Sequence, residues 1–199
     1  MKAMTREIQL EMKPAEALSR LMEGNRRFME NGGKNRDLAE QVRATAEGQY
    51  PFAAVLGCID SRVPAEIVFD QGIGDIFNAR VAGNVVNEDI LGSLEYACNV
   101  AGSKLILVLG HTSCGAVTAA CNKVDMGNIT SLLSKITPAV ESFGKAPVEV
   151  DEVAARNVEL NILRIREESK ILSEMESDGR ILIVGGIYDV ATGKVTLVD

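Results

Sequence analysis

Residues Leu105–His111 read LILVLGH, an uninterrupted apolar run that ends in the only histidine of the 199-residue chain. A second run, FAAVLGC, covers residues 52–58 and ends in a cysteine. Continuous apolar runs of this length are typical of strands that are buried on both faces of a parallel sheet. The two segments therefore predict the centre of an α/β fold, with polar side chains where each strand ends.

Helix and strand patterns alternate on both sides of these two runs. We expect three further strands, at residues 76–82, 181–190 and 194–199. We expect helices at residues 64–69, 87–101, from about 114, 129–143 and 152–176, with residues 145–147 joining the last two. This alternation predicts one α/β domain over residues 1–199, with a mainly parallel central sheet flanked by helices.

The first part of the chain, residues 1–48, precedes the α/β core at residues 49–199. Leu18, Leu21 and Met22 follow the spacing of an amphipathic helix, which Pro14 begins and a glycine pair at 32–33 ends. Asp37 is a plausible N-cap for a second helix that reaches about residue 47. We interpret this segment as an N-terminal helical arm that packs on something other than the core.

Composition limits the classes of partner. Acidic residues outnumber basic ones by 28 to 21, which gives a formal net charge of -7. Nucleic acids and anionic membranes both select clustered lysine and arginine, so we expect neither as a partner. The first residues lack the apolar core of a secretory signal, and no run approaches the ~18 apolar residues of a spanning helix. We therefore expect a cytoplasmic protein.

Two short motifs follow the two central strands: CIDSR at residues 58–62 and HTSC at residues 111–114. Sites in open α/β sheets form outside the carboxyl ends of the strands, so the motifs meet if their strands are neighbours. Cys58, His111 and Cys114 form a nitrogen and sulfur set that suits zinc. Two thiolates neutralise Zn²⁺ and leave one position open. Asp60 is the nearest fourth ligand, but it would make the site anionic and closed, so we expect Asp60 off the metal in the working state.

The same residues also have simpler interpretations. A single cysteine at a strand end is often only a small buried apolar residue, and a single histidine there is often structural. The coincidence of the only histidine with two cysteines and Asp60 favours a metal. Cys98 and Cys121 lie within helical segments, and we assign both to the core.

The chain resembles the beta-class carbonic anhydrases over nearly its whole length. The segments that carry the resemblance are ALSRLMEGNRRF, CIDSRV, AEIVFDQGIGDIFNARVAGN, GSLEYA, VLGHTSCGAV and GGIYDVATGKV. The resemblance implies that Cys58, His111 and Cys114 bind zinc, and that Arg62 holds Asp60 off the metal except in a closed state. It also implies a narrow substrate pocket, for which the matching positions are Gln49, Phe77, Tyr96, Gly83 and Asn84.

The function implied is that of a carbonic anhydrase, a lyase also called carbonate dehydratase. It would hydrate carbon dioxide reversibly to bicarbonate and a proton, by attack of a zinc-bound hydroxide. The resemblance further implies a homodimer, or a higher homo-oligomer such as a homotetramer. Two alternatives stay open: a hydrolase of CS₂ or COS on the same scaffold, and a non-catalytic zinc module that Asp60 closes.

Overall fold

The computed structural model describes residues 3–144 and 148–198. A five-stranded sheet has the order β2-β1-β3-β4-β5, in which all neighbours are parallel except β4 and β5. Its strands are β1 (Ala53–Gly57), β2 (Ile76–Arg80), β3 (Leu105–His111), β4 (Leu182–Tyr188) and β5 (Val195–Val198). The predicted α/β class with a mainly parallel sheet is therefore confirmed.

Strands β1 and β3 lie side by side at the centre of this sheet, and every one of their residues is buried. Successive side chains alternate between two apolar cores because strand residues point to opposite faces. Ala53 and Val55 join one core, while Ala54 and Leu56 join the other. Gly57 pairs with Leu109, so the residues just beyond β1 lie close to the carboxyl end of β3. The two motifs are thereby brought to one edge of the sheet.

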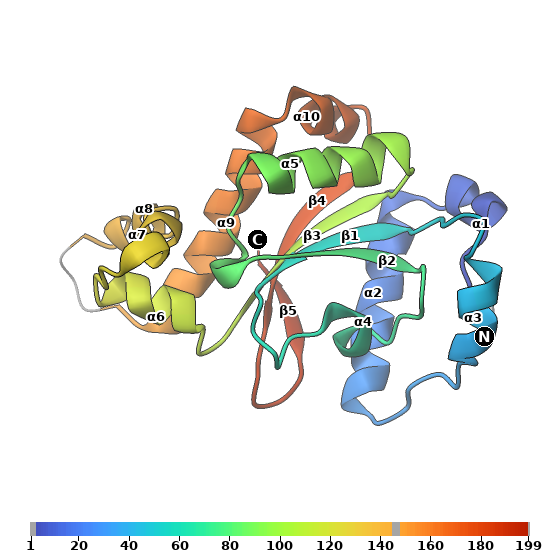
Figure 1. The fold of residues 1–199 in the computed structure, drawn as a ribbon, viewed down its shortest axis with the longest axis horizontal. Helices are drawn as coiled ribbons and strands as arrows, with labels where there is room; N and C mark the ends of the chain where they lie inside the picture. Colours follow the sequence, from blue (N-terminus) through green and yellow to red (C-terminus); the bar gives the residue numbers. More distant parts are fainter. Residues whose placement is uncertain (1–2, 145–147, 199) are drawn as a thin grey trace.

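Helices cover both faces (Figure 1). Helices α2 and α4 pack on one face, and α5, α9 and α10 pack on the other. A group of short helices, α6 to α8, extends beyond the carboxyl end of β3. The bounds are α1 (Arg6–Glu11), α2 (Pro14–Met29), α3 (Leu38–Ala44), α4 (Ala65–Val68), α5 (Glu88–Glu95), α6 (Gly115–Cys121), α7 (Gly127–Leu133), α8 (Thr137–Glu141), α9 (Val150–Glu168) and α10 (Lys170–Ser177). Two single turns, η1 (Ala82–Asn84) and η2 (Tyr96–Val100), complete the set; η2 continues α5 with π-type bonding. No described helix combines the length and apolar character that crossing a bilayer requires.

Two helices that we predicted as continuous are each broken in two. The predicted helix at 129–143 is split into α7 and α8, because Pro138 has no N–H to continue the ladder and instead lies in the first turn of α8. The predicted helix at 152–176 is interrupted at Ser169, whose backbone is extended. The Ser169 hydroxyl accepts the N–H of Leu172 at 3.2 Å and caps α10. Residues 145–147, the predicted connection, lie outside the described part of the chain.

The predicted arm is only partly right. Helices α2 and α3 form as expected, with Asp37 as the N-cap of α3, although α3 ends at Ala44. Our expectation that the arm packs on something else is wrong for α2, because Ala17 and Leu21 are fully buried in the core under the protein's own sheet. Helix α1 was not predicted, since six residues are too few to show a clear helical period.

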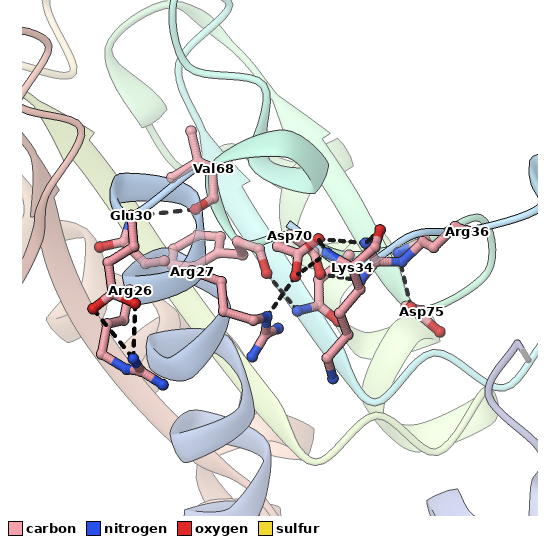
Figure 2. A network of polar contacts seen from close by, with 12 residues as sticks. Arg26, Arg27, Glu30, Lys34, Arg36, Val68, Asp70 and Asp75 are labelled. Carbon is pink, nitrogen blue, oxygen red and sulfur yellow. Dashed lines mark hydrogen bonds and ion pairs between the residues drawn. The ribbon is translucent and has the colours of Figure 1, made fainter. Parts of the chain in front are cut away.

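Asp70 ties the segment after α2 to the end of α4 (Figure 2). Its carboxylate accepts hydrogen bonds from Arg27 Nε at 2.6 Å, from the backbone N–H of Lys34 at 3.2 Å and from the Arg36 guanidinium. The side chains of Asp70, Arg27 and Arg36 are only 7%, 16% and 9% exposed. Burial opposes ionisation, but the hydrogen bonds from Arg36 and Arg27 outweigh it and hold the pKa of Asp70 below its usual value.

We expect Asp70→Asn to lower the free energy of unfolding by about 3 kcal/mol, because loss of one partner leaves buried charges uncompensated. Urea unfolding at pH 7, followed by circular dichroism, measures this loss. Asp178→Asn is the control: Asp178 contacts Arg180 at 3.4 Å with both side chains exposed, so its loss should cost at most about 1 kcal/mol. Because the folded pKa of Asp70 lies below its unfolded value, the stability that the ionised group contributes is fully present above about pH 4 and is lost as the pH falls through the folded pKa, so the wild type and Asp70→Asn should begin to converge only below about pH 4. Equal losses in the two variants at pH 7 would contradict this role.

Candidate metal centre

Three side chains from two neighbouring strand ends meet at the carboxyl edge of the sheet. Cys58 follows β1 directly, His111 is the last residue of β3, and Cys114 is the N-cap of α6. Each offers one ligand atom, and the three atoms lie within 4.8 Å of one another with all three residues buried. The parallel pairing of β1 with β3 is what brings the two motifs together.

His111 presents one ring nitrogen to this cluster. Its Nδ1 lies 2.9 Å from the carbonyl oxygen of Thr112, so Nδ1 carries the proton and donates it there. Its Nε2 is buried and has no hydrogen-bond partner within residues 3–144 and 148–198. An imidazole with one nitrogen anchored to a carbonyl and the other unpartnered is the usual arrangement of a histidine that binds a metal.

Both cysteine sulfurs lie near hydrogen-bond donors. Cys58 Sγ accepts the backbone N–H of Gly83 at 3.3 Å. Contact with Cys114 lowers the pKa of the Cys58 thiol although burial opposes this, and contacts with His111 and with backbone N–H groups add to the lowering. The same contact raises the pKa of the Cys114 thiol. The backbone N–H groups of Val117 and Ala116 act in the opposite direction and lower this pKa, but by less. Two sulfurs and one imidazole nitrogen, drawn together in a buried site, fit zinc.

Asp60 and Arg62 form a paired unit beside the three ligand atoms. Arg62 Nε donates to Asp60 Oδ1 at 2.9 Å and Arg62 Nη2 donates to Oδ2 at 2.8 Å, while the backbone N–H of Arg62 also reaches Oδ1. The hydrogen bonds from Arg62 hold the pKa of Asp60 well below its usual range. Asp60 Oδ2 lies 3.9 Å from His111 Nε2, so the carboxylate stays next to the cluster while Arg62 holds it.

Two residues that the sequence analysis missed hold the loops of this site. Arg80, at the end of β2, donates from Nε to the carbonyl of Cys58 at 2.8 Å and from Nη2 to the carbonyl of Asp60. Asp151, in the first turn of α9, accepts the backbone N–H of Ser113 at 2.7 Å. Ser113 has a φ of 54°, a conformation that non-glycine residues adopt only with support. Neither residue is near the motifs in sequence, so no local pattern indicated them.

The predicted pocket residues fall in two places. The rings of Phe77 and Tyr96 pack edge to face, with their centroids 6.3 Å apart. Both residues line a hollow of about 540 Å³. Gln49 is exposed and is not among the residues that line this hollow. Gly83 and Asn84 are buried in η1 next to Cys58, and the Asn84 side-chain amide nitrogen has no hydrogen-bond partner in the described chain. One chain thus brings Phe77 and Tyr96 together but does not add Gln49 to them.

The two remaining cysteines lie apart from the cluster. Cys98 is buried in the η2 turn, where burial raises the pKa of its thiol to about 12. Cys121 ends α6 and is partly buried. Their assignment to the core is consistent with these positions.

The chain is similar to known proteins over most of its length. The family model for carbonic anhydrase matches residues 53–195. The chain is similar to carbonic anhydrase 2 of Mycobacterium tuberculosis, with 38% identity over 193 residues, covering 94% of this chain and 93% of that protein.

The fold is also similar to solved structures of beta-carbonic anhydrases. The beta-carbonic anhydrase of Coccomyxa, in complex with acetazolamide, matches with a TM-score of 0.73 and 26% identity over 91% of this chain and 86% of that one. One of two tetrameric beta-carbonic anhydrases from Sordaria macrospora matches with a TM-score of 0.68 and 25% identity, over 77% of this chain and 83% of that one.

Proposed function

Since the chain belongs to the beta-class carbonic anhydrase family, we propose that it hydrates carbon dioxide reversibly to bicarbonate and a proton at a zinc centre held by Cys58, His111 and Cys114. The observation that carries this proposal is the buried cluster of three ligand atoms within 4.8 Å of one another. The unpartnered Nε2 of His111 supports it, because a buried polar atom without a partner is costly unless something binds it. Zinc in such a site acts as a Lewis acid that lowers the pKa of water and so provides a nucleophile near neutral pH.

The residues around the cluster have distinct roles in this proposal. Asp60 accepts a hydrogen bond from the attacking water and orients it, and Arg62 keeps the carboxylate in that place. Arginine suits this role because its rigid fork holds both carboxylate oxygens at once. The charge balance supports the same role, since two thiolates neutralise Zn²⁺ whereas a third anionic ligand would fill the position that water needs. A permanently closed zinc module would have no use for Arg62.

The substrate pocket is proposed to lie between subunits of a homodimer or higher homo-oligomer. Carbon dioxide is small and carries no charge, so apolar walls such as Phe77 and Tyr96 are suitable for it. Strand β2, which carries Phe77, is an edge strand, and Tyr96 is 54% exposed although it is large and aromatic. The tetrameric state of the Sordaria macrospora protein supports assembly. Gln49, which does not line the hollow of its own chain, would then join the pocket of a partner subunit.

We expect purified protein to contain about one zinc per chain and to hydrate CO₂ in a stopped-flow assay. Activity should fall gradually below about pH 8, because two thiolates donate more negative charge than imidazoles and keep the pKa of the water above the ~7 of carbonic anhydrase sites with three histidines. The same samples are offered COS and CS₂. Zinc-replete protein that turns over either of these faster than CO₂ would favour the alternative hydrolase, and no turnover of any substrate would favour the non-catalytic module.

A further inference from the structure

Helix α9 is hydrogen-bonded to the loop that carries His111 and Cys114, and to the η1 turn whose Gly83 contacts Cys58. At its start, Asp151 accepts the N–H of Ser113, the residue before Cys114. Further along the helix, Asn157 bonds Gly83 in η1, which contacts Cys58, and Asn161 bonds Val86, two residues after η1. Helix α9 is therefore linked to the metal centre directly at Ser113 and indirectly, through Gly83, at Cys58.

Asn157 and Asn161 are polar residues inside the apolar face of α9. Their side chains lie one turn apart, are 1% and 2% exposed, and are flanked by buried Val153, Val158 and Ile162. Asn161 Nδ2 donates to the Asn157 carbonyl at 2.7 Å and to Asn157 Oδ1 at 3.1 Å. Burying two amides is costly unless each is satisfied, and these two satisfy each other in part. The other hydrogen bonds of the two side chains are made to residues outside α9.

Those remaining bonds hold the backbone of η1 and of the residues just after it. Asn157 Nδ2 donates to the Gly83 carbonyl at 2.9 Å, and Asn161 Oδ1 accepts the N–H of Val86 at 2.8 Å. Gly83 has a φ of 68°, and a Cβ atom there would lie 2.6 Å from Ile136 Cδ1. Glycine is thus required at this turn. Its own N–H points at Cys58 Sγ.

We propose that Asn157 and Asn161 are positioning residues for the metal centre, which hold the backbone on the carbonyl side of Gly83 so that the Gly83 N–H stays on the sulfur of Cys58. Neither asparagine touches a ligand atom: Asn157 acts through Gly83, and Asn161 acts through Asn157 and through Val86. In a buried site an N–H donor draws negative charge from a thiolate, so the pair sets how much charge Cys58 donates to the metal. This inference rests on the proposed function, because it requires that Cys58 binds a metal.

The test uses the full-length protein loaded with Co²⁺, whose thiolate charge-transfer band reports the electron density on sulfur. In Asn157→Ala this band should move to longer wavelength, because a thiolate without its N–H donor gives up charge more easily. The zinc dissociation constant, measured by competition with a chromophoric chelator, should rise roughly 10-fold or more, as is typical when a partner of a metal ligand is lost. Asn161→Ala should shift both readouts in the same direction but less, because Asn161 acts through Asn157.

Asn25→Ala is the matched control. Asn25 is also 1% exposed, and its side chain makes three comparable hydrogen bonds, to the backbone of Val68, Gly193 and Val195. It packs in α2 on the opposite face of the sheet. Its loss should lower the thermal unfolding midpoint much as Asn157→Ala does, yet leave the cobalt band and the zinc dissociation constant unchanged.

Three results would overturn the inference or its premise. An unchanged cobalt band and zinc dissociation constant in folded Asn157→Ala would refute it, and so would an equal shift in Asn25→Ala. If Asn157→Ala does not fold, Asn161→Ala decides by the same two readouts. A wild-type protein that binds neither Zn²⁺ nor Co²⁺ would instead refute the proposed function, and the inference with it.

Discussion

His111→Ala is expected to contain almost no zinc and to hydrate CO₂ at close to the uncatalysed rate. His111 is the only histidine in the chain, and its Nε2 is the only nitrogen in the Cys-His-Cys cluster. With three protein ligands, loss of one leaves two sulfurs, too few for a stable zinc site. Elemental analysis of purified protein gives the zinc content, and stopped-flow hydration gives the rate. Cys58→Ala and Cys114→Ala should behave in the same way.

Cys98→Ala and Cys121→Ala are the controls for that experiment. Both remove a thiol that lies outside the cluster. In Cys98 burial keeps the thiol protonated, as the pKa of about 12 shows, so this residue is no source of thiolate for a metal. Both variants should keep their zinc and their activity. Full zinc occupancy in His111→Ala would contradict the proposed ligand set.

Arg62→Ala is expected to keep zinc but to lose CO₂ hydration activity by at least ~10²-fold, the usual cost of losing a preorganised electrostatic partner. Without Arg62, nothing holds the Asp60 carboxylate away from the metal site, because both of its oxygens are bound by this one side chain. The measured quantity is kcat/KM of samples with equal zinc content. The kcat/KM of Arg62→Lys should lie between those of the wild type and Arg62→Ala, since an ammonium group is a point charge and cannot hold two oxygens in one plane.

A crystal structure of Arg62→Ala near pH 7 would test the cause as well as the effect. We expect an Asp60 oxygen at ~2.0–2.2 Å from zinc in the variant. In the wild type under the same conditions Asp60 should stay paired with Arg62. Unchanged kcat/KM in zinc-replete Arg62→Ala, or Asp60 bound to zinc in the wild type, would contradict the proposed role.

The central strands could be predicted from the sequence because burial on both faces leaves a simple pattern. Strand β3 has the predicted bounds, and β1 differs from its prediction by one residue at each end. Helix breaks were harder to predict, because apolar spacing continues across them. Ser169 interrupts a helix only because its hydroxyl caps α10 and donates to Glu95 at 2.6 Å, a contact from a distant part of the chain. The sequence pattern around Ser169 contains no sign of that contact.

In the candidate site, too, residues in local motifs could be predicted from the sequence, whereas residues that act from distant parts of the chain could not. The three ligand positions lie in two short motifs at strand ends, which is why the sequence alone could indicate them. Arg80, Asp151 and Asn157 support the site from other elements, and their relation to it appears only in the fold. A partial signal did exist for Asn157 and Asn161, since two amides four residues apart within an apolar helical stripe are uncommon unless they bind something.

The hydrogen bonds of α9 to Ser113 and to the η1 turn also set an order of events during synthesis. All three ligand positions leave the ribosome before any part of α9 does, because Cys114 precedes Val150 in the chain. The nascent chain therefore presents its thiols before Asp151 and Asn157 exist to brace the loops that carry them. The candidate site can reach its final geometry only after translation has passed Asn161, so under the proposed function the finished centre would take up zinc late in the life of the new polypeptide.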